Sequence, residues 1–193
     1  MPPPYGTDLS PCGTDSLDTY LFGRILALAA ADSTRPLTAA TGLSRAALER
    51  LLRRHLPDRL ALLDAVPVDA GTGEDAPEEP DLRQLLQEHG ATGAEEEVWL
   101  AAIVARRSLE PNHLWQDLGL ASRADLNALF RRHFPALVRR NAGDMKWKKF
   151  FYRELCRREG MLICKSPNCE VCTDVHACFG QEDGPALLTG LWR

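Results

Sequence analysis

Long hydrophobic runs are absent from this chain of 193 residues, because its longest uninterrupted apolar stretch, residues 25–31, has only seven. A membrane-spanning helix needs about 20 apolar residues, so we expect no transmembrane segment and no membrane partner. The first residues, 1–13, contain neither the basic segment nor the apolar core of a secretory signal. We therefore expect a cytoplasmic protein.

Strand patterns and nucleotide-binding motifs are absent as well. No run of residues alternates between apolar and polar with a period of two between turn signals. The sequence has no GxxxxGK(S/T) motif, no GxGxxG motif after a strand, and no nucleophile elbow. We therefore expect an all-α protein that is not an enzyme.

The net charge is small, at −4, which argues against a protein that coats nucleic acid nonspecifically. This total hides two oppositely charged stretches. Residues 64–97 contain eleven acidic residues and one arginine, whereas residues 123–159 contain eleven basic residues and four acidic ones. The chain therefore has an acidic middle and a basic stretch before its C-terminal end.

A fourteen-residue segment occurs twice. Residues 44–57 read SRAALERLLRRHLP and residues 122–135 read SRADLNALFRRHFP, with nine identical positions at an offset of 78. Each copy follows an apolar helical pattern, at 17–31 and 97–106. The serine that begins each copy is a favoured N-cap, and the proline that ends each copy stops a helix.

The repeat predicts two related small helical units joined by an acidic linker. The linker contains three prolines and two glycines and is expected to bury no face. A basic helix and a cysteine-rich cluster-binding loop are expected to follow. The predicted divisions are residues 1–65 for the N-terminal arm and first unit, 66–80 for the linker, 81–140 for the second unit, and 141–193 for the basic helix, loop and tail.

The repeated segment permits two functional interpretations. Its first copy resembles the second helix of a helix-turn-helix, so a DNA-binding regulator is one hypothesis. The alternative is a structural helical hairpin, which we prefer because the second copy has Ala128 at the position of Arg50. We expect His55 and His133 to cap the carbonyl ends of the two helices. In the DNA-binding interpretation the contacts would come from Arg45, Arg50, Arg53 and Arg54. In the hairpin interpretation the helices would pack through Leu48, Leu51 and Leu52.

Four of the six cysteines predict a metal or cluster site. Their pattern is Cys-x4-Cys-x2-Cys-x5-Cys, and such a density in a cytoplasmic protein favours ligation over disulfides. A single Cys-x2-Cys pair favours an iron–sulfur cluster over structural zinc, although a zinc-stabilised interaction module stays open. Cys156 and His176 are possible additional ligands. The four predicted ligands are Cys164, Cys169, Cys172 and Cys178.

Residues 144–159 predict a helix with two distinct stripes. The apolar stripe consists of Trp147, Phe150, Phe151 and Leu155. The basic stripe consists of Lys146, Lys149, Arg153 and Arg157. Because thiolate-bound iron–sulfur clusters and oxyanions are both negative, the basic stripe could guide an anion or a partner. The alternative is a solvated helix face.

These residues resemble the NifQ family of nitrogen-fixation proteins. The resemblance covers about residues 130–182 and is carried by MKWKKFFYRELC, EGMLIC, the four-cysteine pattern and the Arg-His-Phe-Pro sequence at 132–135. The resemblance implies an iron–sulfur protein that carries molybdenum and supplies it for assembly of the nitrogenase iron–molybdenum cofactor.

The resemblance also implies partners and cargo. The expected partners are the nitrogenase iron protein and the scaffold complex on which the cofactor matures. The expected cargo is molybdate or a molybdenum–sulfur species, held with an iron–sulfur or iron–molybdenum–sulfur cluster. We expect no nucleic acid partner, and an iron–sulfur-sensing DNA-binding regulator stays open as the alternative.

Overall fold

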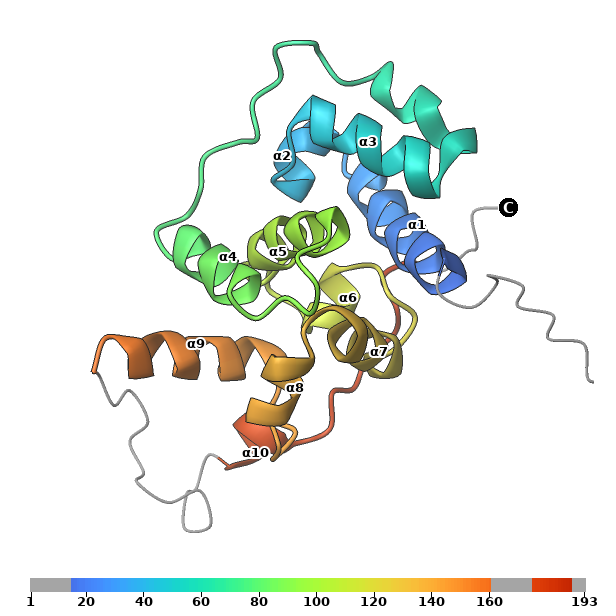
Figure 1. Ribbon diagram of the computed structural model, residues 1–193. Coiled ribbons are helices and arrows are strands. Elements are labelled where there is room, and N and C mark those ends of the chain that lie inside the picture. Colours follow the sequence, from blue (N-terminus) through green and yellow to red (C-terminus); the bar gives the residue numbers. More distant parts are fainter. Residues whose placement is uncertain (1–14, 161–174, 189–193) are drawn as a thin grey trace, which may run out of the picture.

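The computed structural model describes residues 15–160 and 175–188, and within these ranges all regular structure is helical (Figure 1). The elements are α1 (Asp15–Ala31), α2 (Leu37–Thr41), α3 (Arg45–His55), the 3-10 helix η1 (Pro57–Leu63), α4 (Glu79–Gln87), α5 (Glu95–Arg107), α6 (Leu114–Asp117), α7 (Arg123–His133), α8 (Pro135–Arg140), α9 (Trp147–Arg158) and α10 (Val175–Phe179). The all-α prediction is confirmed. Among the described residues, no helix is long and apolar enough to cross a membrane.

Helix α5 lies at the centre of the fold, with α1, α4 and α7 around it (Figure 1). Its residues 99–105 are all buried, so it contacts neighbours around its whole circumference. Three glutamates in its first turn and two arginines in its last turn complement the helix dipole. One hydrophobic core cluster contains residues from α1 through α9.

The two copies of the repeated segment form helices α3 and α7, as predicted. The side chain of Ser44 accepts a hydrogen bond from the Ala47 amide, and Ser122 accepts one from the Asp125 amide, so both serines are N-caps. The carboxylate of Asp125 accepts from the Ala121 amide at 3.1 Å. Each helix ends two residues before its proline, and that proline begins the next helix.

The turns before the two copies pack reciprocally, the first against α5 and the second against α1. Gly42, in the turn before α3, lies on α5, where a Cβ atom would meet the Ala102 carbonyl oxygen at 3.5 Å. Gly119, in the corresponding turn before α7, lies on α1, where a Cβ atom would meet the Arg24 carbonyl oxygen at 2.8 Å. Arg24 and Ala102 are separated by the same offset of 78 as the repeated segments.

The acidic segment 66–80 contacts the core at several points. Val66 and Glu79 are buried. Arg106 of α5 donates to the Thr72 carbonyl oxygen at 3.0 Å and to Asp75 at 2.9 Å, and its guanidinium pairs with Glu79 at 2.7 Å. Arg106 of α5 therefore binds the segment at three positions. The division of the chain into separate units stays a prediction.

The apolar stripe of α9 packs on α7. Trp147 stacks on Phe130 with ring centroids 3.8 Å apart, and Phe151 lies 5.8 Å from the same ring. The Trp147 indole nitrogen donates to Asn127 at 3.0 Å. This packing confirms the predicted apolar face of α9 and leaves its basic stripe on the opposite side.

Candidate functional site

The basic stripe of α9 is largely exposed. Lys149, Arg153 and Arg157 are exposed, and Lys146 at the start of the helix is half-buried. Arg157 pairs with Glu154 at 3.2 Å. Within residues 15–160 and 175–188, no ion pair or side-chain hydrogen bond is formed by Lys149 or Arg153. Two cations on this face are therefore available to an anion or an acidic partner.

The last of the four predicted ligands lies beside the start of this helix. The Lys146 amide donates to the Cys178 carbonyl oxygen at 2.8 Å, and the Lys146 ammonium donates to the His176 carbonyl oxygen at 3.4 Å. Cys178 is half-buried and free of a disulfide. His176 is exposed. Helix α10 is thereby attached to the first residue of the basic stripe.

The other predicted ligands, Cys164, Cys169 and Cys172, lie outside the described residues. Cys156 is a buried free thiol near the C-terminal end of α9. Burial, assisted by the negative charge of Glu159, raises the pKa of this thiol. In the described ranges no group of three or more His, Cys, Asp or Glu side chains is arranged to hold a metal ion. The predicted ligand set therefore stays a prediction.

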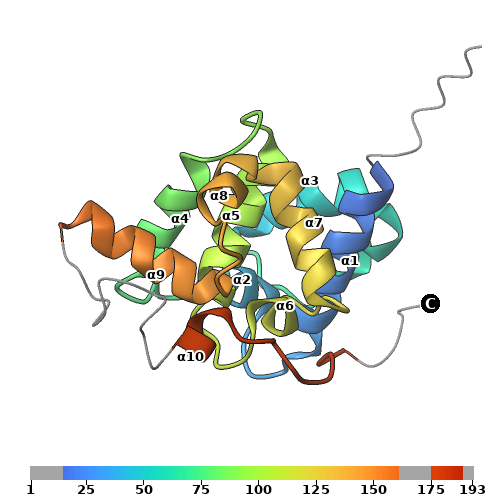
Figure 2. The same ribbon diagram turned by 90° about the horizontal axis from the view of Figure 1, so that it is seen from below.

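The segment after α10 is fastened to the helical core, running from α10 past α6 toward α1 (Figure 2). Glu182 is an almost fully buried carboxylate that pairs with Arg123 at 3.0 Å. The Gln116 side chain donates to the Pro185 carbonyl oxygen at 2.7 Å, and Arg24 donates to the Leu188 carbonyl oxygen at 3.2 Å. These contacts fix the segment that carries Cys178, and no sequence pattern indicated them.

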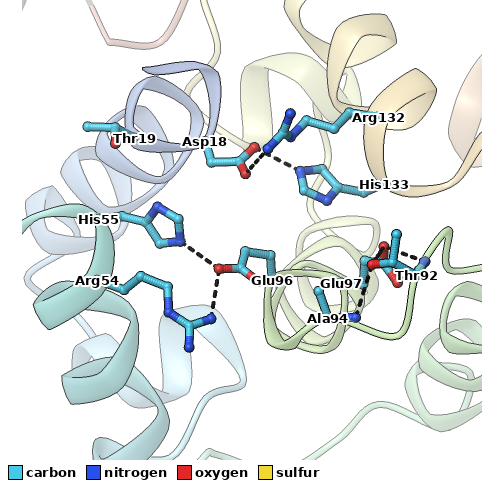
Figure 3. Close-up of a pocket in the computed structure, with 10 residues that line it drawn as sticks. All are labelled: Asp18, Thr19, Arg54, His55, Thr92, Ala94, Glu96, Glu97, Arg132 and His133. Atoms are coloured by element: carbon cyan, nitrogen blue, oxygen red, sulfur yellow. Dashed lines mark hydrogen bonds and ion pairs between the residues drawn. The ribbon is translucent and has the colours of Figure 1, made fainter. Parts of the chain in front are cut away.

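A second candidate site lies between the two copies of the repeat (Figure 3). His55 at the end of α3 is 3.0 Å from Glu96 of α5, and His133 at the end of α7 is 3.0 Å from Asp18 of α1. The expectation that these histidines cap helix carbonyls is therefore wrong. Each imidazole is instead bonded to a carboxylate of the other half, on α5 for His55 and on α1 for His133.

The preceding arginine of each copy binds the same carboxylate. Arg54 donates to Glu96 at 2.9 Å, and Arg132 donates to Asp18 at 2.7 Å. Asp18 and Glu96 are 78 residues apart, so the acids repeat at the same offset as the Arg-His pairs. The offset of 78 residues was therefore the sequence signal for these reciprocal contacts. It relates two acidic residues that lie outside the repeated fourteen-residue segment.

These groups surround a cavity of about 460 Å³, which we call the repeat cavity. Its volume is within the range of about 300–1,000 Å³ that is typical of small-molecule pockets. The lining residues are Asp18, Thr19, Arg54, His55, Thr92, Ala94, Glu96, Glu97, Arg132 and His133. The cavity is thus lined by charged and hydrogen-bonding side chains from four helices and the turn before α5.

Burial and ion pairing shift two of the lining groups. Burial alone would raise the pKa of Glu96, but hydrogen bonds from Arg54 and His55 outweigh it and lower the pKa to about 2. Burial lowers the pKa of His133, against the opposing charge of Asp18. At neutral pH the cavity therefore contains an ionised Glu96 and a neutral His133.

A repeated helical pair, a polar cavity between its copies and a cysteine-containing segment beside a basic helix characterise this all-helical protein. The NifQ family model matches residues 21–180, and the chain belongs to the NifQ family. The match includes the N-terminal half, which the sequence motifs did not cover. Members of this family have a role related to nitrogen fixation.

Curated relatives support the assignment over most of the chain. A protein named NifQ homolog from Sinorhizobium fredii is 39% identical over 172 residues, which are 86% of this chain and 74% of the relative. Proteins named NifQ from Rhodobacter capsulatus and Azotobacter vinelandii are each 40% identical, over 76% and 73% of this chain and 79% and 77% of the relatives. No solved structure matches the chain significantly.

Proposed function

We propose that this protein binds an iron–sulfur cluster with molybdenum and supplies the molybdenum for assembly of the nitrogenase iron–molybdenum cofactor. The observation that carries the proposal is the attachment of Cys178 to the start of α9, whose basic stripe has unpaired cations among the described residues. An anionic cluster or oxyanion cargo beside Cys178 would be attracted by that stripe. The protein acts in this proposal as a cytoplasmic metal donor and not as an enzyme.

The chemistry of the proposed ligands suits this cargo. Thiolates are soft ligands that hold iron–sulfur clusters. Cys178 is half-buried on a short helix and is not consumed by a disulfide, so its thiol is free to act as a ligand. A donor must also release its cargo, which a ligand at the protein surface permits. We therefore assign Cys164, Cys169, Cys172 and Cys178 as the ligands.

Metal analysis of the anaerobically purified full-length protein tests the proposal. We expect iron, sulfide and molybdenum together with a brown visible spectrum, and replacement of any one of the four cysteines by Ala should remove all three. Cys12→Ala should change nothing. Zinc alone in a colourless protein would overturn the proposal in favour of an interaction module, and full iron and molybdenum in two of the four variants would refute the ligand assignment.

The same measurement decides the two uncertain ligands. Cys156 is a buried thiol with a raised pKa, and a ligand must be deprotonated. We therefore expect Cys156→Ala to retain iron and molybdenum. His176→Ala should retain iron, and selective loss of molybdenum in this variant would assign His176 as a ligand of the heterometal.

The basic stripe is proposed to serve cargo or partner docking. Reversing Lys149 and Arg153 to Glu should lower the molybdenum-to-iron ratio or slow molybdenum transfer to a cofactor-assembly mixture, while helix content and iron stay unchanged. Arg131→Glu with Arg139→Glu is the matched control, because both side chains are exposed on other helices. High salt should reproduce the defect in the unmodified protein, since exposed charges are screened. Normal loading and delivery in the double reversal would refute this role.

The proposed partners follow from the cargo. Docking to the nitrogenase iron protein or to the cofactor-assembly scaffold complex would place the cysteine segment against the acceptor. Cross-linking of the purified proteins, with and without the double reversal at Lys149 and Arg153, measures whether α9 takes part. Equal cross-linking of both forms would locate docking elsewhere.

A further inference from the structure

The repeat cavity retains hydrogen-bond donors that the protein does not use. The Nη1 of Arg132 forms no hydrogen bond among the described residues and, unlike the enclosed Nε, is not buried. Arg132 binds Asp18 through Nη2. Arg54 binds Glu96 and Glu95 through its two Nη atoms, which leaves its Nε without a protein acceptor in the described ranges. A guanidinium has five N–H donors and no acceptor, so both arginines have donors left for a ligand.

The carboxylates of the repeat cavity already have protein donors. Asp18 receives one hydrogen bond on each oxygen, from Arg132 and from His133. Glu97 receives hydrogen bonds from the Thr92 amide, the Thr92 hydroxyl and the Gly93 amide at 2.7 to 2.9 Å. These carboxylates are therefore satisfied without a metal ion. What the repeat cavity lacks is an acceptor.

The net charge of the lining depends on the two imidazoles. The lining contains three carboxylates and two guanidiniums, so its formal charge is −1 with neutral imidazoles and +1 with both protonated. Protonation does not break the existing contacts, because the Nε2 hydrogen of each imidazole still reaches its carboxylate. An anion would consequently bind together with a proton.

We propose that the repeat cavity binds a small tetrahedral oxyanion together with a proton taken up by His133. The guanidinium fork suits such an anion because its planar donors match oxyanion geometry. Molybdate is the anion that the proposed function selects, and only this choice rests on the proposed function. The repeat cavity would then hold molybdate as an oxyanion at a site separate from the cysteine segment.

The surroundings of the two imidazoles give the direction of the pH dependence. His133 faces Asp18 of α1, Glu97 of α5 and its own neighbour Arg132, and burial lowers its pKa. His55 faces Glu96 of α5 and the rings of Phe22 and Trp99. A bound anion stabilises the protonated form of His133 and raises its pKa. The affinity should therefore rise as the pH falls through the histidine range, about 7 to 5.

Equilibrium dialysis of the full-length protein against molybdate, at pH 6 and pH 8, measures this binding, with sulfate and phosphate as separate arms. We expect saturable binding that is tighter at pH 6. Arg54→Gln and Arg132→Lys should each weaken it on the order of tenfold, because Arg54→Gln removes a positive charge and Arg132→Lys replaces the planar guanidinium fork by a point charge. The matched controls are Arg53→Gln and Arg131→Lys, the preceding residues on the same helices, which do not line the repeat cavity.

A histidine variant separates proton coupling from shape. His133→Gln should reduce the difference in affinity between pH 6 and pH 8. Circular dichroism checks folding, and Arg54→Gln carries the test if a variant with a buried substitution does not fold, because the Arg54 side chain is 49% exposed. Absence of saturable binding at both pH values, or equal affinity in the Arg54 variant and its control, overturns the proposal.

A cysteine variant distinguishes this site from the proposed cluster. Cys169→Ala should bind molybdate as tightly as the unmodified protein. Loss of binding in that variant would place the anion at the cysteine segment, which overturns the repeat cavity as the site and leaves the proposed function standing. Tighter binding of sulfate or phosphate than molybdate would support an oxyanion site and overturn its link to molybdenum supply.

Discussion

Removing the Asp18 carboxylate should strongly destabilise the protein. Asp18 is buried on α1 and is bonded to Arg132 at 2.7 Å and to His133 at 3.0 Å, both on α7. The change Asp18→Ala leaves a buried imidazole and a partly buried guanidinium without an acceptor. Breaking a buried pair in this way costs about 3–5 kcal/mol, and we expect that loss in the free energy of unfolding.

Urea denaturation followed by circular dichroism measures this loss. Small proteins have slopes of about 1–3 kcal/mol per molar urea, so the midpoint should fall by roughly 1 M or more. Glu49→Ala is the matched control, because Glu49 also pairs with an arginine, Arg53, but the two side chains are 43% and 64% exposed. Exposed pairs contribute little, so this control should leave the midpoint unchanged.

A double-mutant cycle isolates the interaction itself. Asp18→Ala and His133→Ala should together cost less than the sum of the single changes, with a coupling energy of about 0.5–3 kcal/mol for residues in direct contact. Two results would refute the reasoning: a midpoint for Asp18→Ala equal to that of the Glu49 control, or a coupling energy of zero. Either would mean that the contacts of Asp18 with Arg132 and His133 contribute little to the packing of α1 against α7.

Four further outcomes are expected. Because burial lowers the pKa of His133 below its unfolded value near 6.5, stability should fall as the pH drops below about 6.5, and His133→Gln should reduce that fall in pH-dependent urea melts. Gly119→Ala should lower the free energy of unfolding by more than about 1 kcal/mol, since φ is +71° and the new Cβ would meet the Arg24 carbonyl oxygen at 2.8 Å. Gly93 also has a positive φ, but a Cβ there would meet no atom within 4 Å. A similar loss in Gly93→Ala would therefore contradict the steric explanation. Trp147→Ala should cost about 3–5 kcal/mol in the same melts, because the indole is buried against Phe130. Gel-shift assays on nitrogen-fixation promoters should show only weak, salt-sensitive association, and a complex that survives 200 mM salt would favour the regulator.

The helices could be predicted from the sequence wherever one face is apolar or a cap is present. Ser44 and Ser122 began their helices as predicted because capping is a local interaction. Tyr20 lies within the apolar helical pattern predicted at 17–31, but it is exposed and donates to Asp125 of α7. Spacing alone could not show this, because α1 is buried on several sides and its polar contacts come from a helix more than 100 residues away.

The partners of the repeated histidines show the same limit more clearly. A histidine before a helix-ending proline can reach a carbonyl of its own helix or a carboxylate of another, and local sequence does not distinguish the two. The offset of 78 residues between Asp18 and Glu96 could have identified these carboxylates as the partners of the histidines. That prediction would also have required knowledge that the two halves pack reciprocally. The C-terminal contacts of Glu182 had no sequence signal, because a single buried acid has no pattern.

The ion pairs of the first repeated helix bear on the choice between metal donor and DNA-binding regulator. A recognition helix needs free basic side chains for phosphates and bases. Every arginine of α3 is already bonded: Arg45 to the carbonyl oxygens of Leu63 and Val66, Arg50 to Glu95, Arg53 to Glu49, and Arg54 to Glu95 and Glu96. DNA would have to displace these carboxylates, which costs binding energy that unpaired arginines would not. Lys149 and Arg153, which form no ion pair among the described residues, instead lie on α9. Lys146, directly before the first residue of α9, donates its amide hydrogen to the Cys178 carbonyl oxygen. The distribution of paired and unpaired cations therefore favours an anionic cargo or partner at α9 over DNA at α3.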